Sequence, residues 1–129
     1  MEYNLEERTV KFSIELISLC KLIKRSMLNE NIIKQVLRSG TSIGANYYEA
    51  NGATSKADFK SKIHICKKES KETMYWLRLL IGVVDKDIKD KIKILWEENK
   101  QLTLIFSKGL NISLPRGTGI FELINTIAM

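Results

Sequence analysis

Hydrophobic positions recur at alternating spacings of three and four residues along most of the chain. The third of four such stretches is the most regular, because its line from Phe59 to Val84 keeps this spacing throughout and only Ser70 and Thr73 on it are polar. Side chains three and four residues apart lie on one face of an α-helix, whereas a strand alternates every second residue. The pattern therefore predicts four helices, at about residues 4–25, 31–50, 55–83 and 87–107.

Short polar links separate these stretches, which favours consecutive helices that pack side by side in opposite directions. A chain of 129 residues, 44% of them hydrophobic, fits one domain with one core. We expect an all-α fold, an antiparallel up-down-up-down four-helix bundle, over residues 1–107. Residues 108–129 are expected to form an irregular tail. Its apolar end is expected to dock on the bundle or on a neighbouring subunit, or to be disordered in the monomer.

Two glycines interrupt the second helix. Gly40 and Gly44 lie on or beside its apolar face, and a glycine inside a helix costs about 1 kcal/mol relative to alanine. We interpret them as positions where a neighbouring backbone packs closely, and a ligand lying against bare backbone is the alternative. A polar row follows another face of this helix, either in solvent or as a buried hydrogen-bond network: Arg38, Ser42, Asn46 and Glu49.

One polar side chain occupies the apolar line of the fourth helix. Asn99 falls between Leu95 and Leu102 on that line. A single buried asparagine can fix the register or the oligomeric state of packed helices. A partly exposed position for Asn99 is the alternative.

The chain is basic, with a formal net charge of +6, and most of this charge lies on the third helix. Residues 55–82 hold seven Lys or Arg and three acids, which places +4 there. Basic side chains form a stripe along this helix and are candidates for binding nucleic acid, although a solvated face is the alternative: Lys56, Lys60, His64, Lys67, Lys71 and Arg78. The other flank mixes acids with apolar side chains and is a candidate subunit interface: Ile65, Glu69, Glu72 and Trp76.

Few residues could support catalysis or hold a cofactor. His64 is the one histidine, so a di-iron bundle site, which needs two, cannot be assembled within one chain. A catalytic triad needs a histidine held by an acid and facing a nucleophile, and nothing near His64 in the sequence supports one. Cys20 and Cys66 occupy apolar positions of different helices and are expected to be reduced core thiols. A carboxylate pair drawn from Glu49, Glu69 and Glu72 is the remaining catalytic alternative. We expect no enzymatic activity, no metal and no cofactor.

No targeting signal is visible in the sequence. No apolar run reaches the roughly 18 residues that a membrane-spanning helix needs. The first residues, Met1 to Glu7, have neither the basic nor the apolar region of a signal peptide. We therefore expect a cytoplasmic protein that does not enter a membrane.

The run RSGTSIGANYYEANGATSKADFKSKIHICKKESKETMYWLRLL resembles a four-helix-bundle family that includes proteins encoded in intervening sequences of bacterial 23S ribosomal RNA genes. The accessory variability protein of diversity-generating retroelements looks like a relative of this family. The family's S-I-x-x-N-x-x-E signature and the aromatic residue after the turn match Ser42, Ile43, Asn46, Glu49 and Phe59. Three positions depart from the pattern: Tyr47 and Tyr48, where small or aliphatic residues are common, and Ala50, where glycine is common.

The resemblance implies an antiparallel bundle that assembles as a homopentameric ring. It also implies nucleic-acid binding, which has been proposed for some members, and no known enzymatic activity. A ring would repeat the basic stripe and multiply its phosphate contacts. We expect a protein that binds RNA or DNA with little sequence preference. The alternative is a scaffold or adaptor that recruits a protein partner, such as a nucleic-acid enzyme.

Overall fold

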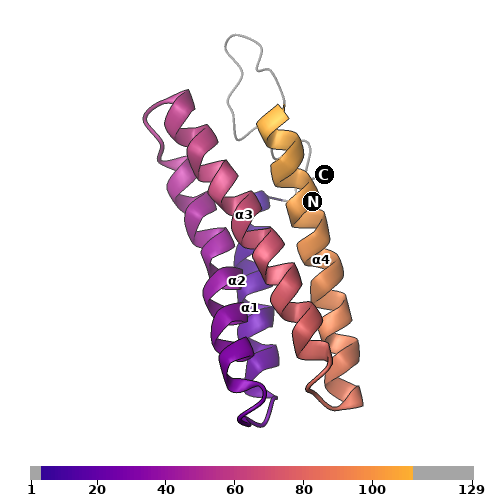
Figure 1. Ribbon diagram of the computed structural model, residues 1–129. Helices are drawn as coiled ribbons and strands as arrows, with labels where there is room; N and C mark the ends of the chain where they lie inside the picture. The colour runs from indigo at the N-terminus through magenta and orange to yellow at the C-terminus, as the bar shows by residue number, and fades with distance from the viewer. Residues whose placement is uncertain (1–3, 112–129) are drawn as a thin grey trace.

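The computed structural model describes residues 4–111, and within this range the chain is all-helical. Four helices pack together (Figure 1), as the spacing of apolar residues predicted. Their bounds are α1 Leu5–Lys21, α2 Glu30–Asn51, α3 Lys56–Ile81 and α4 Lys86–Asn111. The tail prediction falls mostly beyond the described residues. No helix in residues 4–111 is long and apolar enough to span a bilayer.

Each helix packs mainly on its neighbour in the sequence. The contacts of α3 with α2 and with α4 are the most extensive, and α1 packs on α2 and, less extensively, on α4. The α1–α2 and α3–α4 links lie at one end of the bundle and the α2–α3 link lies at the other (Figure 1). The middle of the sequence therefore forms the best-packed half of the molecule.

Local capping explains where the helices begin and end. The side chains of Asn4 and Ser55 accept hydrogen bonds from backbone N–H groups in the first turns of α1 and α3, at 2.7 and 3.1 Å. The first helix ends at Lys21, earlier than expected. The side chain of Asn29 explains this, because it donates to the carbonyl of Lys24 at 3.0 Å and accepts from the N–H of Ser26 at 2.9 Å. These bonds hold the link in a turn.

The core contains one face of every helix. Every position of the α3 line from Phe59 to Leu80 is buried, including Ser70 and Thr73, and Val84 beyond it is half-buried. The ring of Tyr47 on α2 lies 6.0 Å, centroid to centroid, from that of Phe106 on α4. The regular spacing therefore marked the buried residues of α3 correctly.

The two glycines of α2 face α1. A Cβ atom at Gly40 would collide with the Leu16 side chain, and one at Gly44 would lie 3.2 Å from Thr9. Close packing was the expected reason for both glycines, and no ligand is needed to explain them. At Gly40 the neighbour is a side chain of α1, however, and not its backbone.

Asn99 is completely buried, and neither its amide nitrogen nor its amide oxygen has a hydrogen-bond partner within residues 4–111. A buried polar group without partners costs about 1–3 kcal/mol. Asn99→Leu is therefore expected to raise the free energy of unfolding by about that amount, as measured by urea denaturation. The control is Asn99→Asp, which keeps the size, adds a buried charge and should lower stability. A lower denaturation midpoint for Asn99→Leu would contradict this expectation.

Both cysteines are free thiols, as predicted. The Sγ of Cys66 donates to the carbonyl of Ile43 at 3.5 Å, and Cys20 lines a groove between α1 and α2. Burial raises the pKa of the Cys66 thiol from 9.0 to about 12 and that of Cys20 to about 11. Both thiols therefore stay neutral near physiological pH.

At about pH 8, the folded protein should react with iodoacetamide much more slowly than the chain unfolded in urea, because the thiolate is the reactive form. The folded-state pKa of Cys66 lies above its ordinary value, so the unfolded chain loses this proton first as pH rises. The stability that the neutral thiol contributes is full below about pH 9 and falls toward about pH 12. Cys66→Ala should lose less stability than the parent protein between these two pH values, which urea denaturation would measure. Equal rates of reaction with iodoacetamide for the folded and the unfolded protein would contradict the burial of the thiols.

Candidate nucleic-acid interface

The predicted basic stripe runs along one side of α3. Five of its side chains are exposed and Lys67 is half-buried: Lys56, Lys60, His64, Lys67, Lys71 and Arg78. None of the six forms an ion pair within residues 4–111. Their positive charge is therefore not neutralised by the part of the chain that the structure describes.

This stripe borders α4. On α3, Met74 continues the row of Lys67, Lys71 and Arg78 at spacings of four and three. Thr103 of α4 lies 3.6 Å from the Met74 sulfur and donates a hydrogen bond to Ser70 at 3.0 Å. The basic side chains therefore follow the seam between α3 and α4.

A second row of bases lies on the α4 side of this seam. Lys93, Trp96 and Lys100 follow one another at spacings of three and four on α4, and Lys93 and Trp96 line a groove together with Arg78 of α3. We call the two rows the α3–α4 basic face: Lys60, Lys67, Lys71, Arg78, Lys93 and Lys100. Sequence reasoning missed the α4 row, because bases and acids balance over residues 83–107. The spacing of Lys93, Trp96 and Lys100 was the available signal.

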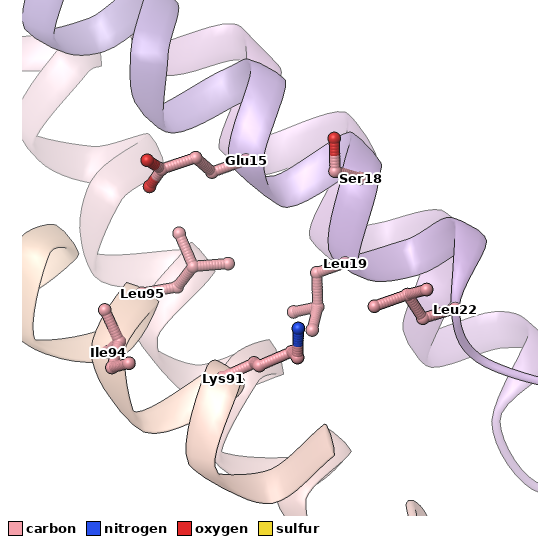
Figure 2. A pocket seen from close by; sticks show the side chains of 7 residues that line it. All are labelled: Glu15, Ser18, Leu19, Leu22, Lys91, Ile94 and Leu95. Atoms are coloured by element: carbon pink, nitrogen blue, oxygen red, sulfur yellow. The ribbon is translucent and has the colours of Figure 1, made fainter. Parts of the chain in front are cut away.

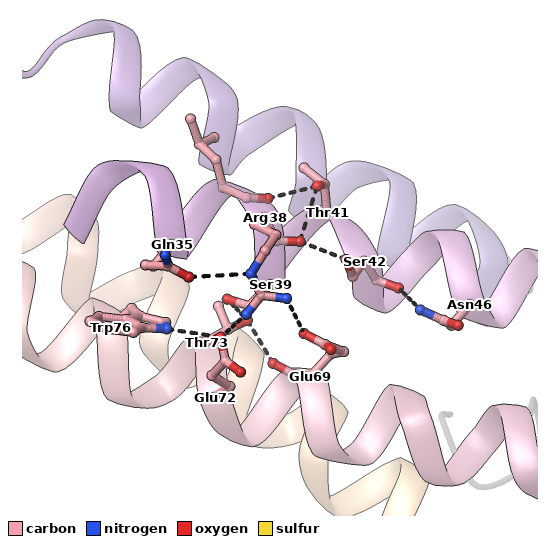
Figure 3. Close-up of polar contacts among 11 residues, drawn as sticks. Gln35, Arg38, Ser39, Thr41, Ser42, Asn46, Glu69, Glu72, Thr73 and Trp76 are labelled. Carbon is pink, nitrogen blue, oxygen red and sulfur yellow. Dashed lines mark hydrogen bonds and ion pairs between the residues drawn. The ribbon is translucent and has the colours of Figure 1, made fainter. Parts of the chain in front are cut away.

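The opposite flank of α3 faces α2, and its acids are bonded within the chain. Glu69 and Glu72 each pair with Arg38 of α2, and the indole N–H of Trp76 donates to Glu72 at 3.0 Å (Figure 3). Trp76 and Ile65 are both half-buried. These four residues were the candidate subunit interface, and that role stays a prediction. The acids already stabilise the packing of α2 on α3.

The polar signature residues Ser42 and Asn46 are bonded within α2, and the apolar ones lie in the core. Ser42 donates to the carbonyl of Arg38 at 2.6 Å, and Asn46 donates to the carbonyl of Ser42 at 2.8 Å (Figure 3). Ile43 and Phe59 are buried in the core. The row of polar residues on α2 is therefore neither fully solvated nor a closed buried network.

The last residue of the signature, Glu49, is exposed and pairs with Lys62 of α3 at 2.8 Å. Hydrogen bonding to Glu49 is the main cause that raises the pKa of Lys62. The contrast with the basic stripe is direct, since this lysine of α3 has a carboxylate partner and those of the stripe have none within residues 4–111. Lys62 is therefore not part of the unneutralised surface.

Other hollows open on the surface away from the α3–α4 basic face. A groove of about 290 Å³ between α1 and α4 is lined mainly by apolar side chains, with Glu15 and Lys91 as its two charged residues (Figure 2). A groove of about 280 Å³ between α1 and α2 contains Cys20, whose raised pKa makes it a poor nucleophile. No cluster of three metal-binding side chains occurs among the described residues.

One exposed surface is apolar. Val10, Ile14 and Ile17 follow one another on α1 at spacings of four and three and are 44%, 58% and 40% exposed. These residues widen the apolar side of α1 beyond what one neighbouring helix can cover. Within residues 4–111, α2 and α4 pack on α1 and leave this outer stripe open.

Comparison with known proteins gives a consistent assignment. The sequence model of a family described as 23S rRNA-intervening sequence protein matches residues 2–104. A crystal structure from Bacteroides thetaiotaomicron VPI-5482, of a protein with unknown function from the S23 ribosomal protein family, is 32% identical. That match covers 83% of this chain and 98% of the other, with a TM-score of 0.69. No curated protein sequence matches the chain. This chain belongs to the 23S rRNA-intervening sequence protein family.

Proposed function

We propose that this protein is a non-enzymatic, cytoplasmic helical bundle that binds RNA or DNA through the phosphate backbone, with little sequence preference. The observation that carries this proposal is the α3–α4 basic face, whose lysine and arginine side chains form no ion pairs within residues 4–111. Phosphate contacts of this kind depend on charge and not on base sequence.

The ion pairs of the described residues are compatible with this choice of surface, although bases elsewhere, such as Lys21, Lys24 and Lys34, also lack them, so the choice depends on the clustering of bases along one seam. Arg8 pairs with Glu98 at 2.6 Å, Lys62 pairs with Glu49, and Arg38 pairs with Glu69 and Glu72, all away from the α3–α4 basic face. Several bases elsewhere therefore already have carboxylate partners. The α3–α4 basic face keeps its charge available for a polyanion.

The proposal includes an assembly. We infer an antiparallel up-down-up-down bundle that forms a homopentameric ring, and kinship with the accessory variability protein of diversity-generating retroelements. The exposed stripe of Val10, Ile14 and Ile17 supports contact between copies, since contiguous apolar side chains on a surface mark interaction sites. A ring with identical head-to-tail contacts would repeat the basic face around its axis.

Titration of labelled RNA and DNA tests the function. At about 50 mM salt, we expect binding of both nucleic acids with similar affinities for unrelated sequences. At about 200 mM salt, the affinity should fall steeply, because binding releases counterions from the phosphates. Fluorescence polarisation would measure both affinities, and light scattering of the same samples would give the mass of the assembly. Absence of binding at the lower salt concentration would contradict the proposal, and the mass of a single chain would remove the ring from it.

A scaffold or adaptor is the second candidate function. It is favoured by the same apolar stripe of α1, which would be covered by a protein partner in place of another copy. A protein that binds no nucleic acid at low salt and stays a single chain in solution would support this candidate. The two functions are therefore separated by the same titration.

A further inference from the structure

A groove of about 490 Å³ opens between α3 and α4 at one end of the α3–α4 basic face. It is lined by Arg78 and Ile81 from α3 and by Lys93, Trp96 and Glu97 from α4. This volume lies within the range of about 300–1,000 Å³ that is typical of small-ligand sites. Arg78 belongs to both surfaces, so the basic stripe of α3 leads directly to an aromatic side chain.

The indole ring of Trp96 is half-buried and packs against the core. The ammonium group of Lys100 lies 5.7 Å from the centre of the ring, within the range of a cation–π contact. The face of the Trp96 ring is therefore accessible to a side chain from the protein surface. The core contacts hold the ring in place, which lowers the entropy lost when a planar ligand stacks on it.

We propose that the groove binds one unpaired base of a single-stranded nucleic acid, stacked on Trp96, with the flanking phosphates held by Arg78 and Lys93. This inference rests on the proposed function and names its ligand more narrowly. Proteins that bind single strands combine a basic groove with aromatic side chains on which bases stack. A base inside a duplex is already stacked on both faces, so Trp96 selects single strands over duplexes.

The remaining side chains of the groove fit this occupant. The carboxylate of Glu97 disfavours a phosphate at its own position and accepts a hydrogen bond from an exocyclic amino group of a base. Ile81 supplies an apolar contact beside the ring. When a nucleobase stacks on Trp96, the Lys100 side chain moves off the ring. It then joins Arg78 and Lys93 in contacting the phosphates of the nucleic acid.

The chain contains a matched control for Trp96. Trp76 is also half-buried, but it lies on the α2 flank of α3, where its indole N–H is bonded to Glu72 and its ring meets the edge of Tyr75 at 5.1 Å. It is not part of the groove. Each tryptophan can therefore be made the only tryptophan of the chain, and excitation at the red edge of its absorption selects it over the tyrosines.

The test uses Trp76→Phe, which leaves Trp96, and Trp96→Phe, which leaves Trp76. Each is titrated at about 50 mM salt with a short mixed-sequence single strand and with the matching duplex. We expect quenching of Trp96 by the single strand and not by the duplex, and no quenching of Trp76. Trp96→Leu, which fills the site without an aromatic face, should weaken single-strand binding about 5- to 150-fold and leave duplex binding unchanged.

The outcomes separate this inference from the function on which it rests. Binding of single strands without quenching of Trp96, or with full affinity in Trp96→Leu, would overturn the stacking site and leave phosphate binding in place. If neither the single strand nor the duplex binds, both the stacking site and the proposed phosphate binding are overturned. Circular dichroism of each variant identifies any loss of affinity that comes from unfolding.

Discussion

Replacing Lys60, Lys67 and Lys71 together with glutamate is expected to abolish nucleic-acid binding at about 200 mM salt. These ammonium groups lie on the α3–α4 basic face without ion pairs in residues 4–111, so their exchange breaks no ion pair there and places three carboxylates beside the remaining Arg78, Lys93 and Lys100. Each exchange replaces a positive charge with a negative one, and the formal net charge falls from +6 to zero. The slope of log affinity against log salt should decrease by about three, one unit for each lost phosphate contact.

A control variant with the same net charge separates surface from charge. Lys21, Lys24 and Lys34 are exposed on the α1–α2 side of the molecule and can be replaced with glutamate in the same way. This variant should keep the salt slope of the parent protein, apart from a modest loss of affinity through the long-range field. Equal losses in the two variants, measured by fluorescence polarisation, would show that overall charge matters and the α3–α4 basic face does not.

Tyr47→Ala is expected to lower the free energy of unfolding by about 3–5 kcal/mol. Tyr47 is only 1% exposed, and its ring packs at 6.0 Å from that of Phe106, so truncation leaves a cavity between α2 and α4. The loss is a large part of the 5–15 kcal/mol that stabilises a typical domain. Urea denaturation followed by circular dichroism would measure it.

The adjacent tyrosine provides the control. Tyr48 is 69% exposed, so Tyr48→Ala should change stability by no more than about 0.5 kcal/mol. Both positions depart from the common family pattern, and only Tyr47 is part of the core. Similar denaturation midpoints for the two variants would contradict the packing described for Tyr47.

The position of each helix in the sequence, and the face that it buries, follow from local sequence patterns. The apolar line of α3 predicted its buried residues, because the period of a helix alone decides which side chains share a face. The early end of α1 was missed, since it depends on hydrogen bonds that Asn29 makes within the link. The burial of Asn99 was left open, because spacing places a residue on a line without showing how closely the neighbouring helix covers it.

The candidate site was predictable in part. The stripe on α3 follows from spacing within one helix, so its six residues could be named from the sequence. The contribution of Lys93, Trp96 and Lys100 depends on how α4 is rotated about its axis, which contacts such as that of Thr103 with Ser70 determine. The pairing of Glu69 and Glu72 with Arg38 likewise joins residues that are 31 and 34 positions apart, on the consecutive helices α2 and α3. Such contacts are tertiary and leave no local pattern.

The preference of each helix for its sequence neighbour has a consequence for how the chain reaches its native state. Contacts between consecutive helices close short loops, and those between α1 and α4, which span most of the chain, are fewer than those of any consecutive pair. Domains with such a low contact order fold in microseconds to milliseconds. Rapid folding of this kind leaves the apolar stripe of α1 exposed, since α2 and α4 cover other faces of α1 within residues 4–111.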